Sequence, residues 1–271
     1  MSPGARLNSQ LVSESHDNAV REQFRIQAAT FTDQGFAVRG LNWIVDGLAP
    51  AAGEQVLDVA AGAAHLGRAL APHVAHVSAI DLTPEMLEQG QHLASRQGLG
   101  NIAFQVGNAT ALPWLDAQFD LVACRIVLHQ VADPGAVVRE MVRVTRACGR
   151  IGVIDIIADE DPLVAAETNR LERLRDPSHG RTLTVAELHG LLSAAGAVVG
   201  CTVREENDLD FEDWMERTQT PAGLRGQLRD RIAEELGGGA PTGLRPRRDE
   251  RGTVTITHTW AMIVATPPQV G

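Results

Sequence analysis

The stretch Val56–Asp81, VLDVAAGAAHLGRALAPHVAHVSAID, decides the fold of this 271-residue chain. Its apolar start, which holds the single acid Asp58, predicts a strand, and the small residues 60–64 predict a tight turn. A helical pattern follows, and a second apolar run ends at Asp81. The order of strand, turn, helix, strand and acid is typical of a nucleoside-binding crossover unit.

Strand and helix patterns alternate along most of the chain. Near-continuous apolar runs predict strands at residues 55–60, 77–81, 102–107, 119–124, 151–157, 197–204 and 253–265. Helical periodicity occurs at residues 66–70, 83–97, 134–146, 162–175, 184–195 and 211–236, with two further helices within 20–48, whereas residues before 20 are expected to be mobile. Apolar strands that alternate with helices form mainly parallel sheets with helices on both faces. We therefore predict an α/β fold, Rossmann-like and doubly wound, with a seven-stranded, mostly parallel sheet, an antiparallel last strand and a helical cap.

Composition narrows the classes of function. The formal net charge is −10, from 24 Lys and Arg against 34 Asp and Glu, which argues against nucleic acid as a partner. No apolar run approaches the roughly 18 residues that span a bilayer, and residues 1–20 lack the apolar centre of a signal peptide. The three cysteines have no metal-ligand spacing, so we expect reduced thiols, a cytoplasmic location and no bound metal. The basic run at 245–248 is interpreted as a solvated loop.

The turn at residues 60–64 indicates the kind of ligand that the crossover unit binds. Small residues let the backbone approach a ligand, and the helix that follows offers free N–H groups. A pyrophosphate cradle of the form G-x-G-x-x-G is poorly supported, because Gly62 is the only glycine there. A nucleoside that depends less on phosphate fits better, with Asp81 accepting both ribose hydroxyls at a strand end. The alternative for Asp81 is a helix cap, a role that we assign to Thr83.

Six groups of residues follow one another in an order that points to one family. They are VLDVAAGAA (56–64), AIDLTPEML (79–87), GNATALPW (107–114), FDLV (119–122), LHQV (128–131) and EMVRV with GR (140–144 and 149–150). The series resembles the class I S-adenosylmethionine-dependent methyltransferases, and is most similar to the small-molecule branch that includes the ubiquinone-biosynthesis type. The resemblance covers residues 50–157 well and the remainder more loosely.

This resemblance implies S-adenosyl-L-methionine as the cofactor and a role for each matched position. Asp58 would lie beneath a turn that approaches the methionine part of the cofactor, formed by Ala60, Ala61, Gly62 and Ala64. The other implied cofactor-binding residues are Asp81 at the ribose, Leu82 on the adenine with Met86 in the same motif, Asn108 and Ala109 at the adenine edge, and Cys124 and Arg125 beside the methionine part.

Three positions depart from the family pattern. Alanines stand at 60 and 64, where glycines are usual, so either the cofactor shifts slightly or a less permissive residue holds the same backbone. Asn108 replaces an aspartate that usually accepts a hydrogen bond from the adenine amino group, and its side-chain oxygen can still accept that bond. The run Ala147-Cys148-Gly149 replaces a Pro-Gly-Gly type of hairpin, a change that we expect to be neutral.

Catalysis needs little from side chains, because the sulfonium activates the methyl group and the transfer mostly requires positioning and exclusion of water. The candidate catalytic residues are His129, His179 and Arg175. His129 follows the fourth strand and is either a general base or a histidine that packs near the cofactor. The polar loop 175–181 could bind an anionic acceptor or supply His179 as a base; the alternative is a surface loop held by its own Asp–Arg pairs. His258 alternates with apolar residues and is expected to be structural.

The acceptor side of the site is expected in a cap. We assign residues 1–50 to an N-terminal helical cap segment and residues 51–271 to the cofactor-binding domain, with cap insertions at about 160–183 and 207–250. Residues of this type belong more often to the ordinary core, but the candidate lining residues are Phe24, Phe31, Phe36, Trp43, Phe211, Trp214 and Met215. The chain has no tyrosine, so no phenol is available as a base.

Three hypotheses for the function follow. The favoured one is methyl transfer to a small-molecule acceptor by a cytoplasmic enzyme that needs neither nucleic acid nor membrane and could form a homodimer. The second keeps the cofactor but gives it other chemistry, a cyclisation or an elimination at the sulfonium. The third is a non-catalytic, cofactor-binding scaffold in which residues 207–250 form an interface. A dinucleotide oxidoreductase is disfavoured by the missing glycines and by the family motifs.

Overall fold

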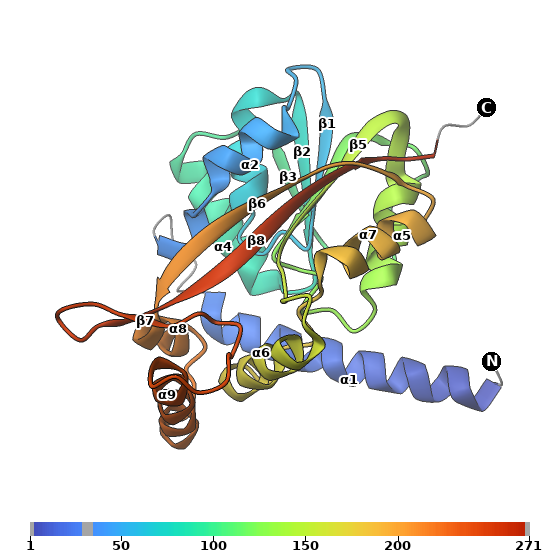
Figure 1. The fold of residues 1–271 in the computed structure, drawn as a ribbon. Coiled ribbons are helices and arrows are strands. Elements are labelled where there is room, and N and C mark those ends of the chain that lie inside the picture. The colour runs from blue at the N-terminus through green and yellow to red at the C-terminus, as the bar shows by residue number, and fades with distance from the viewer. Residues whose placement is uncertain (1–2, 29–34, 269–271) are drawn as a thin grey trace.

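A single mixed sheet runs through the computed structural model, which describes residues 3–28 and 35–268, with side chains from Ser15 onward (Figure 1). The strand order is β3-β2-β1-β4-β5-β8-β6, with the two-residue β7 paired to β8. Strands β1 to β5 pair in parallel, and β8 runs antiparallel to both β5 and β6. This confirms the predicted α/β fold and its seven-stranded, mostly parallel sheet. The strands are β1 Gln55–Val59, β2 His76–Asp81, β3 Ile102–Val106, β4 Phe119–Arg125, β5 Thr145–Ile156, β6 Val198–Asp210, β7 Arg247–Arg248 and β8 Val254–Thr266.

Helices cover both faces of the sheet. One buried apolar cluster joins the sheet to α5 and α7, and another joins its opposite face to α2 and α3. Helix α4 packs against β2 and β3. The helices are α1 Pro3–Gln27, η2 Gly35–Val38, α2 Leu41–Leu48, α3 His65–Leu70, η3 Ala71–His73, α4 Pro84–Arg96, α5 Pro134–Val144, α6 Pro162–Arg175, α7 Val185–Ala194, α8 Phe211–Arg217 and α9 Ala222–Leu236.

Strand β1 shows why the strands read as continuous apolar runs. Leu57 and Val59 pack into the cluster with α5 and α7, whereas Val56 packs into the cluster with α2 and α3. Successive side chains of a strand point to opposite faces, and both faces are buried here. Asp58 is therefore a buried carboxyl group in a strand with apolar neighbours on both sides, 1% exposed.

The N-terminal helix and the start of β5 differ from expectation. Helix α1 begins at Pro3, inside the segment that was expected to be mobile. Strand β5 begins at Thr145, six residues before the predicted start, because Thr145 pairs with Phe119 of β4 ahead of a register irregularity. A capping box fixes the start of α7, in which Thr184 and Glu187 each accept a hydrogen bond from the other's backbone N–H.

Strand β6 continues six residues beyond its predicted end. It stays paired with β8 up to the register pair Asp210–Thr255. Its acids Glu206 and Asp208 pair with Arg245 and Arg247, respectively, so opposite charges stabilise a polar run that favours loops by itself. The basic run that was interpreted as a loop thus forms ion pairs along this ribbon, and part of it is β7.

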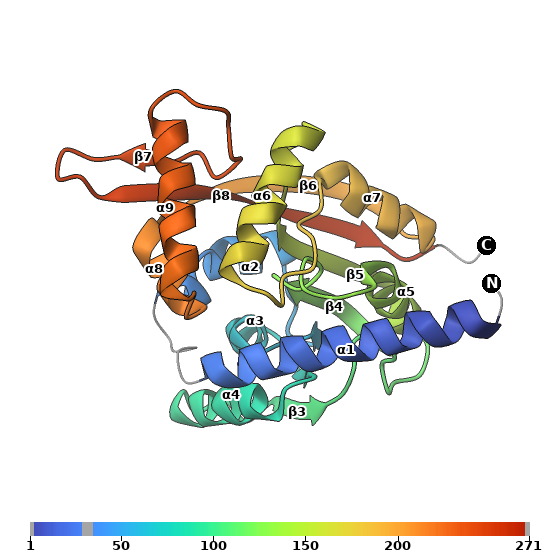
Figure 2. The same ribbon diagram turned by 90° about the horizontal axis from the view of Figure 1, so that it is seen from below.

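The long β6–β8 ribbon carries the cap. In Figure 1 α1, α6, α8 and α9 gather below the sheet, and Figure 2 shows α1 running across that edge. Helix α8 follows β6 directly, and the cap helices α6, α8 and α9 share a third buried cluster that includes Leu171, Trp214, Leu228 and Ile256. The candidate lining residues Phe211, Trp214 and Met215 belong to this cluster, and are cap core.

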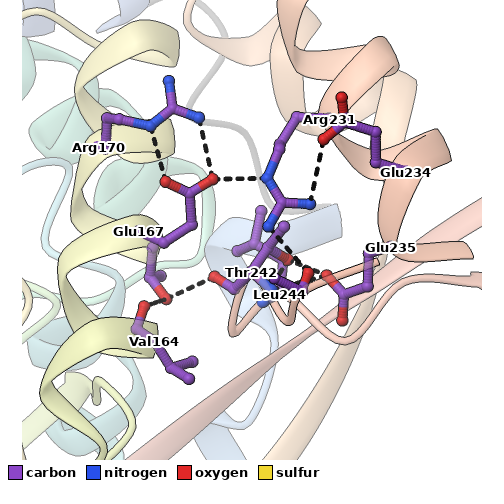
Figure 3. A network of polar contacts seen from close by, with 10 residues as sticks. Val164, Glu167, Arg170, Arg231, Glu234, Glu235, Thr242 and Leu244 are labelled. Carbon is purple, nitrogen blue, oxygen red and sulfur yellow. Dashed lines mark hydrogen bonds and ion pairs between the residues drawn. The ribbon is translucent and has the colours of Figure 1, made fainter. Parts of the chain in front are cut away.

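A polar network ties α6 to α9 on the outside of the cap (Figure 3). The Glu167 carboxylate accepts hydrogen bonds from Arg170 on its own helix and from Arg231 on α9, each at 2.7 Å. Glu235 accepts from the backbone N–H of Thr242 at 2.8 Å, so the loop after α9 is held to the same helix. The cap therefore has its own buried apolar core, and its own polar network links its helices.

Two helix-interior glycines allow a matched test of how α4 packs. A Cβ at Gly90 in α4 would lie 3.0 Å from the backbone C and O of Ala63, whereas a Cβ at Gly190 in α7 would meet nothing within 4 Å. We expect Gly190→Ala to stabilise the protein by about 0.5–1 kcal/mol through helix propensity. Gly90→Ala should destabilise it, because overpacking costs about 1–3 kcal/mol. Denaturant unfolding of both variants checks the prediction, and equal gains in stability would contradict it.

Candidate functional site

The turn after β1 holds three residues in the left-handed region of the backbone map. The φ angles are 50° at Ala60, 54° at Gly62 and 52° at Ala64. This conformation costs a non-glycine residue about 1–2 kcal/mol. The two alanines thus hold the left-handed backbone that glycine adopts freely, which is one of the two outcomes expected for them.

Two buried carboxyl groups flank this turn. Asp58 Oδ2 accepts a hydrogen bond from the Gly67 N–H at 2.8 Å, and burial raises the pKa of Asp58 to about 7. Asp81 accepts from the N–H of Gly62 at 2.7 Å and of Thr83 at 2.8 Å, and burial raises its pKa as well. Thr83 is the N-cap residue of α4, as predicted, but its side chain makes no cap hydrogen bond, and Asp81 accepts from the Thr83 N–H. Asp81 also joins the end of β2 to the turn.

A cavity of about 350 Å³ opens between this turn, α1 and the cap. The predicted cofactor residues on its wall are Asp58, Ala60, Ala61, Gly62, Asp81, Leu82, Met86, Asn108, Ala109 and Arg125. Ala64 and Cys124 are fully buried and lie outside the wall. Of the candidate acceptor-side aromatics, Phe24 and Phe36 line the cavity, Trp43 packs on the core, and Phe31 lies outside the described residues.

Asn108 is engaged with its neighbours at one end of this cavity. Its Oδ1 accepts hydrogen bonds from the backbone N–H and the hydroxyl of Thr110, both at 2.9 Å. Its Nδ2 donates to Asp17 Oδ2 of α1 at 3.2 Å. The expected hydrogen bond from an adenine amino group to Asn108 Oδ1 would therefore require exchange of a Thr110 bond. Asp17 lines the same cavity and brings a carboxylate to this end.

His129 and Asp155 form a buried pair on the cavity wall. His129 Nδ1 lies 2.6 Å from Asp155 Oδ1, and because a carboxylate only accepts, Nδ1–H donates and leaves Nε2 as the basic nitrogen. Burial works to lower the pKa of His129, but the charge and hydrogen bond of Asp155 outweigh it, so this pKa is raised above 6.5. A histidine oriented by a carboxylate in this way has the arrangement of a general base.

His179 packs behind His129 and does not line the cavity. Their ring centroids are 5.7 Å apart, His179 Nε2 lies 3.0 Å from Asn169 Oδ1, and His179 is 5% exposed. Burial lowers the pKa of His179 to about 4, which keeps it neutral at pH 7. The alternative of a surface loop is wrong, since Asp176, Ser178 and His179 are all buried. Nearby Arg181 instead forms an exposed ion pair with Glu187.

Arg175 lines the cavity and is paired. Its Nε lies 3.3 Å from Glu172 Oε2, and its guanidinium lies 4.7 Å from the centroid of the Trp214 ring. Glu172 also lies 3.3 Å from His258 Nε2, and His258 is a cavity-lining residue although it was expected to be structural. Despite burial, the charge of Arg175 and the contact with His258 hold the pKa of Glu172 well below its usual range.

Sequence reasoning missed Asp155 and Arg217. Asp155 is a buried acid near the end of the apolar strand β5, the same signal that singled out Asp58 in β1, and it could have been found that way. Arg217 lines the cavity from the last position of α8, and no local pattern marks it. Within residues 3–28 and 35–268 no cluster of three or more His, Cys, Asp or Glu side chains is arranged to hold a metal. No described helix has both the length and the apolar character needed to cross a bilayer.

Comparison with known proteins links this fold and site to one family. The family model described as Methyltransferase domain matches residues 50–208, more than half of the chain. The uncharacterized methyltransferase YcgJ of Bacillus subtilis is 36% identical over 174 residues, which are 64% of this chain and 69% of YcgJ. The demethylmenaquinone methyltransferase of Clavibacter sepedonicus is 38% identical over 117 residues, 43% of this chain and 47% of that protein.

Solved structures agree with this relationship. The crystal structure of YcgJ matches with a TM-score of 0.77 at 28% identity, covering 85% of this chain and 99% of that chain. The [4+2]-cyclase SpnF matches with a TM-score of 0.62 at 17% identity, covering 97% of each chain, a likeness of fold alone. On the strength of the family match, the ordered motifs and the shared fold, the chain belongs to the class I S-adenosylmethionine-dependent methyltransferases.

Proposed function

We propose that this methyltransferase acts on a small-molecule acceptor, with His129 as the general base that Asp155 orients. The observation that carries the proposal is one cavity lined by the turn and Asp81 on one side and by His129 on the other. Such a cavity can hold a nucleoside cofactor and a small acceptor side by side, in the crevice at the carboxyl ends of the strands where α/β folds bind ligands.

The described residues fit the adenosyl cofactor. Asp81 Oδ2 accepts from the Gly62 N–H and Oδ1 from the Thr83 N–H, and the Leu82 N–H and the Thr83 side chain also act on this carboxylate, so a ribose hydroxyl would share it with these donors. A Cβ at Gly62 would meet Met86 Cε at 3.0 Å, so the missing side chain keeps the turn open beside Met86. Asp17 offers a carboxylate that could accept from an adenine amino group in place of the aspartate usual at position 108.

The residues around His129 suit proton removal from the acceptor. S-adenosylmethionine, when bound, supplies an activated methyl group, so the protein has to orient the acceptor and take up its proton. Asp155 fixes the His129 ring with Nε2 available as the base and stabilises the imidazolium that forms. Helix α1 covers the cavity through a hydrogen bond from Gln23 to the Thr218 carbonyl and another from His16 to the Gln130 carbonyl, and this cover excludes water.

The domain limits, a cytoplasmic location and a homodimer stay predictions. The cap insertions expected at about 160–183 and 207–250 contain the helices α6, α8 and α9. Cys148 and Cys201 are exposed free thiols and Cys124 is buried, a pattern that suits a reducing compartment.

Replacement of Asp81 tests the cofactor half of the site. We expect Asp81→Asn to bind S-adenosylhomocysteine about ten- to hundredfold more weakly, because charged hydrogen bonds to the ribose are lost. Isothermal titration calorimetry measures the affinity, and Asp116→Asn, at an exposed acid of another loop, is the control. Because Asp81 also holds the Gly62 N–H, the melting temperature without ligand separates lost binding from a loosened turn. Unchanged affinity in Asp81→Asn would refute the ribose assignment.

Replacement of His129 tests the chemistry. With a panel of small molecules that carry hydroxyl, thiol or amine groups, we expect mass spectrometry to find S-adenosylhomocysteine as the spent cofactor. His129→Gln should lower kcat by about 10²–10⁴, the usual contribution of a general base. Methylthioadenosine in place of S-adenosylhomocysteine would instead show breakage on the amino-acid side of the sulfonium and would contradict methyl transfer.

The pH dependence gives a second test of the same pair. His129 must be neutral to act as a base, so kcat/KM should rise with pH through a pKa above 6.5. In Asp155→Asn the carboxylate charge is gone while burial remains, so the pKa of His129 should fall below 6.5. Nuclear magnetic resonance of the histidine rings measures the pKa of His129 in both proteins. A pKa of His129 that is the same in Asp155→Asn as in the wild type would contradict the assigned roles.

A further inference from the structure

Among the described residues three arginines line the cavity, and two of them already have partners within the protein. Arg125 donates to the Phe36 and Arg39 carbonyls at 3.4 and 3.0 Å and lies over Trp260, 5.1 Å from the ring centroid. Arg175 is paired with Glu172. Both side chains therefore have partners within the protein, which distinguishes them from the third arginine.

Arg217 is the third arginine, and among the described residues its guanidinium forms no direct ion pair. Among the described residues no carboxylate lies within 4.0 Å of it and no hydrogen-bond partner is found. Its guanidinium carbon lies 4.2 Å from the centroid of the Phe36 ring, which shields one face of the group. Burial, followed by the charge of Arg175, lowers the pKa of Arg217 to about 10, although the charges of Glu172 and Asp213 act to raise it. An anionic ligand that enters the cavity would therefore stabilise the guanidinium of Arg217.

The carboxylates near the acceptor end are occupied elsewhere. Asp155 is bound by His129, and Glu172 lies between Arg175 and His258. Asp176 also lines the cavity, but its Oδ1 accepts from the backbone N–H and the hydroxyl of Ser178 at 2.9 and 2.6 Å. Among the described residues neither these carboxylates nor Asp213, which precedes Arg217 on α8, forms a direct ion pair with Arg217, so its guanidinium remains available to a ligand.

We propose that Arg217 binds a carboxylate of the acceptor, so that the substrates of this enzyme are small carboxylic acids with an apolar body. The inference rests on the proposed function, since it assigns the acceptor half of the same cavity. A guanidinium presents its N–H groups as a planar fork that matches a carboxylate. Phe36, Ile156 and Val127 line the cavity as well and suit an apolar body.

The charge count favours a carboxylate over a phosphate ester. One unpaired guanidinium balances the single charge of a carboxylate, whereas a phosphate monoester carries about 1.5 to 2 negative charges at pH 7. The additional negative charge of a phosphate would lie in a cavity that the buried Asp176 carboxylate also lines, and burying a second negative charge without a partner is unfavourable. A phosphate ester that binds as tightly as the carboxylate, or more tightly, would therefore contradict the proposal.

Matched probes test the proposal on the full chain. The probes are phenylacetate, its neutral isostere phenylacetamide, and phenyl phosphate, each titrated calorimetrically in the presence of saturating S-adenosylhomocysteine. We expect the wild type to bind phenylacetate at least about tenfold more tightly than phenylacetamide, and more tightly than phenyl phosphate.

Variants assign this preference to Arg217. Arg217→Met should abolish the preference for the acid, and Arg217→Lys, which keeps the charge but lacks the fork, should retain part of it. The control is Arg229→Met on α9, whose arginine pairs with Glu212 on the outside of the cap, and it should retain the full preference. Arg217→Met should melt close to the wild type without ligand, because the arginine is half-buried, forms no direct ion pair among the described residues and is replaced by a side chain that can still pack on Phe36.

The outcomes separate this inference from the proposed function. If S-adenosylhomocysteine binds but the acid is not preferred over the amide, or binds no more tightly than the phosphate, the carboxylate proposal is wrong and the cofactor assignment stands. A preference that survives Arg217→Met, or one lost together with a large drop in melting temperature, would also overturn it. If S-adenosylhomocysteine itself does not bind, the cofactor assignment fails first.

Discussion

Asp155 accepts four hydrogen bonds at the end of β5, and the acceptor half of the site depends on them. Its Oδ2 accepts from the backbone N–H of Leu128 at 2.7 Å and of His129 at 3.3 Å, while its Oδ1 accepts from Ile156 at 2.8 Å and from the His129 ring. The carboxylate therefore fixes the loop after β4 against the end of β5. Without it, His129 would have neither a fixed ring orientation nor a raised pKa.

The cofactor half is organised by a different carboxylate and carries strain. Asp81 bridges the end of β2 to the turn after β1, where Ala60 and Ala64 sit at positive φ. Asp58 lies beneath that turn with a pKa raised to about 7 by burial. Such strain and desolvated charge reduce stability, and they concentrate where a ligand can offset them. The sheet and its two apolar clusters supply the rigidity that holds this arrangement.

Local patterns in the sequence predicted the sheet and most of the residues on the turn side of the cavity. The run from Val56 to Asp81 forms one crossover unit, and its strands, turn and helix depend on residues that are close in sequence. The local pattern was therefore sufficient to predict these elements. The extension of β6 to Asp210 was missed because polar residues such as Glu206 are strand-like only through ion pairs with residues nearly 40 positions away, such as Arg245. Arg217 was missed for the same reason, since its setting depends on Phe36 and Arg175, which are distant along the chain. Features that depend on contacts between residues distant in sequence could therefore not be predicted from periodicity.

The central claim is that one cavity holds the cofactor on the turn and Asp81 with its sulfur facing His129. A crystal structure of the protein with S-adenosylhomocysteine tests it most directly. The account predicts ribose hydroxyls on the Asp81 carboxylate and the sulfur directed toward the space between His129 and Arg217. A nucleoside bound away from Asp81, or a sulfur that faces away from His129, would contradict it.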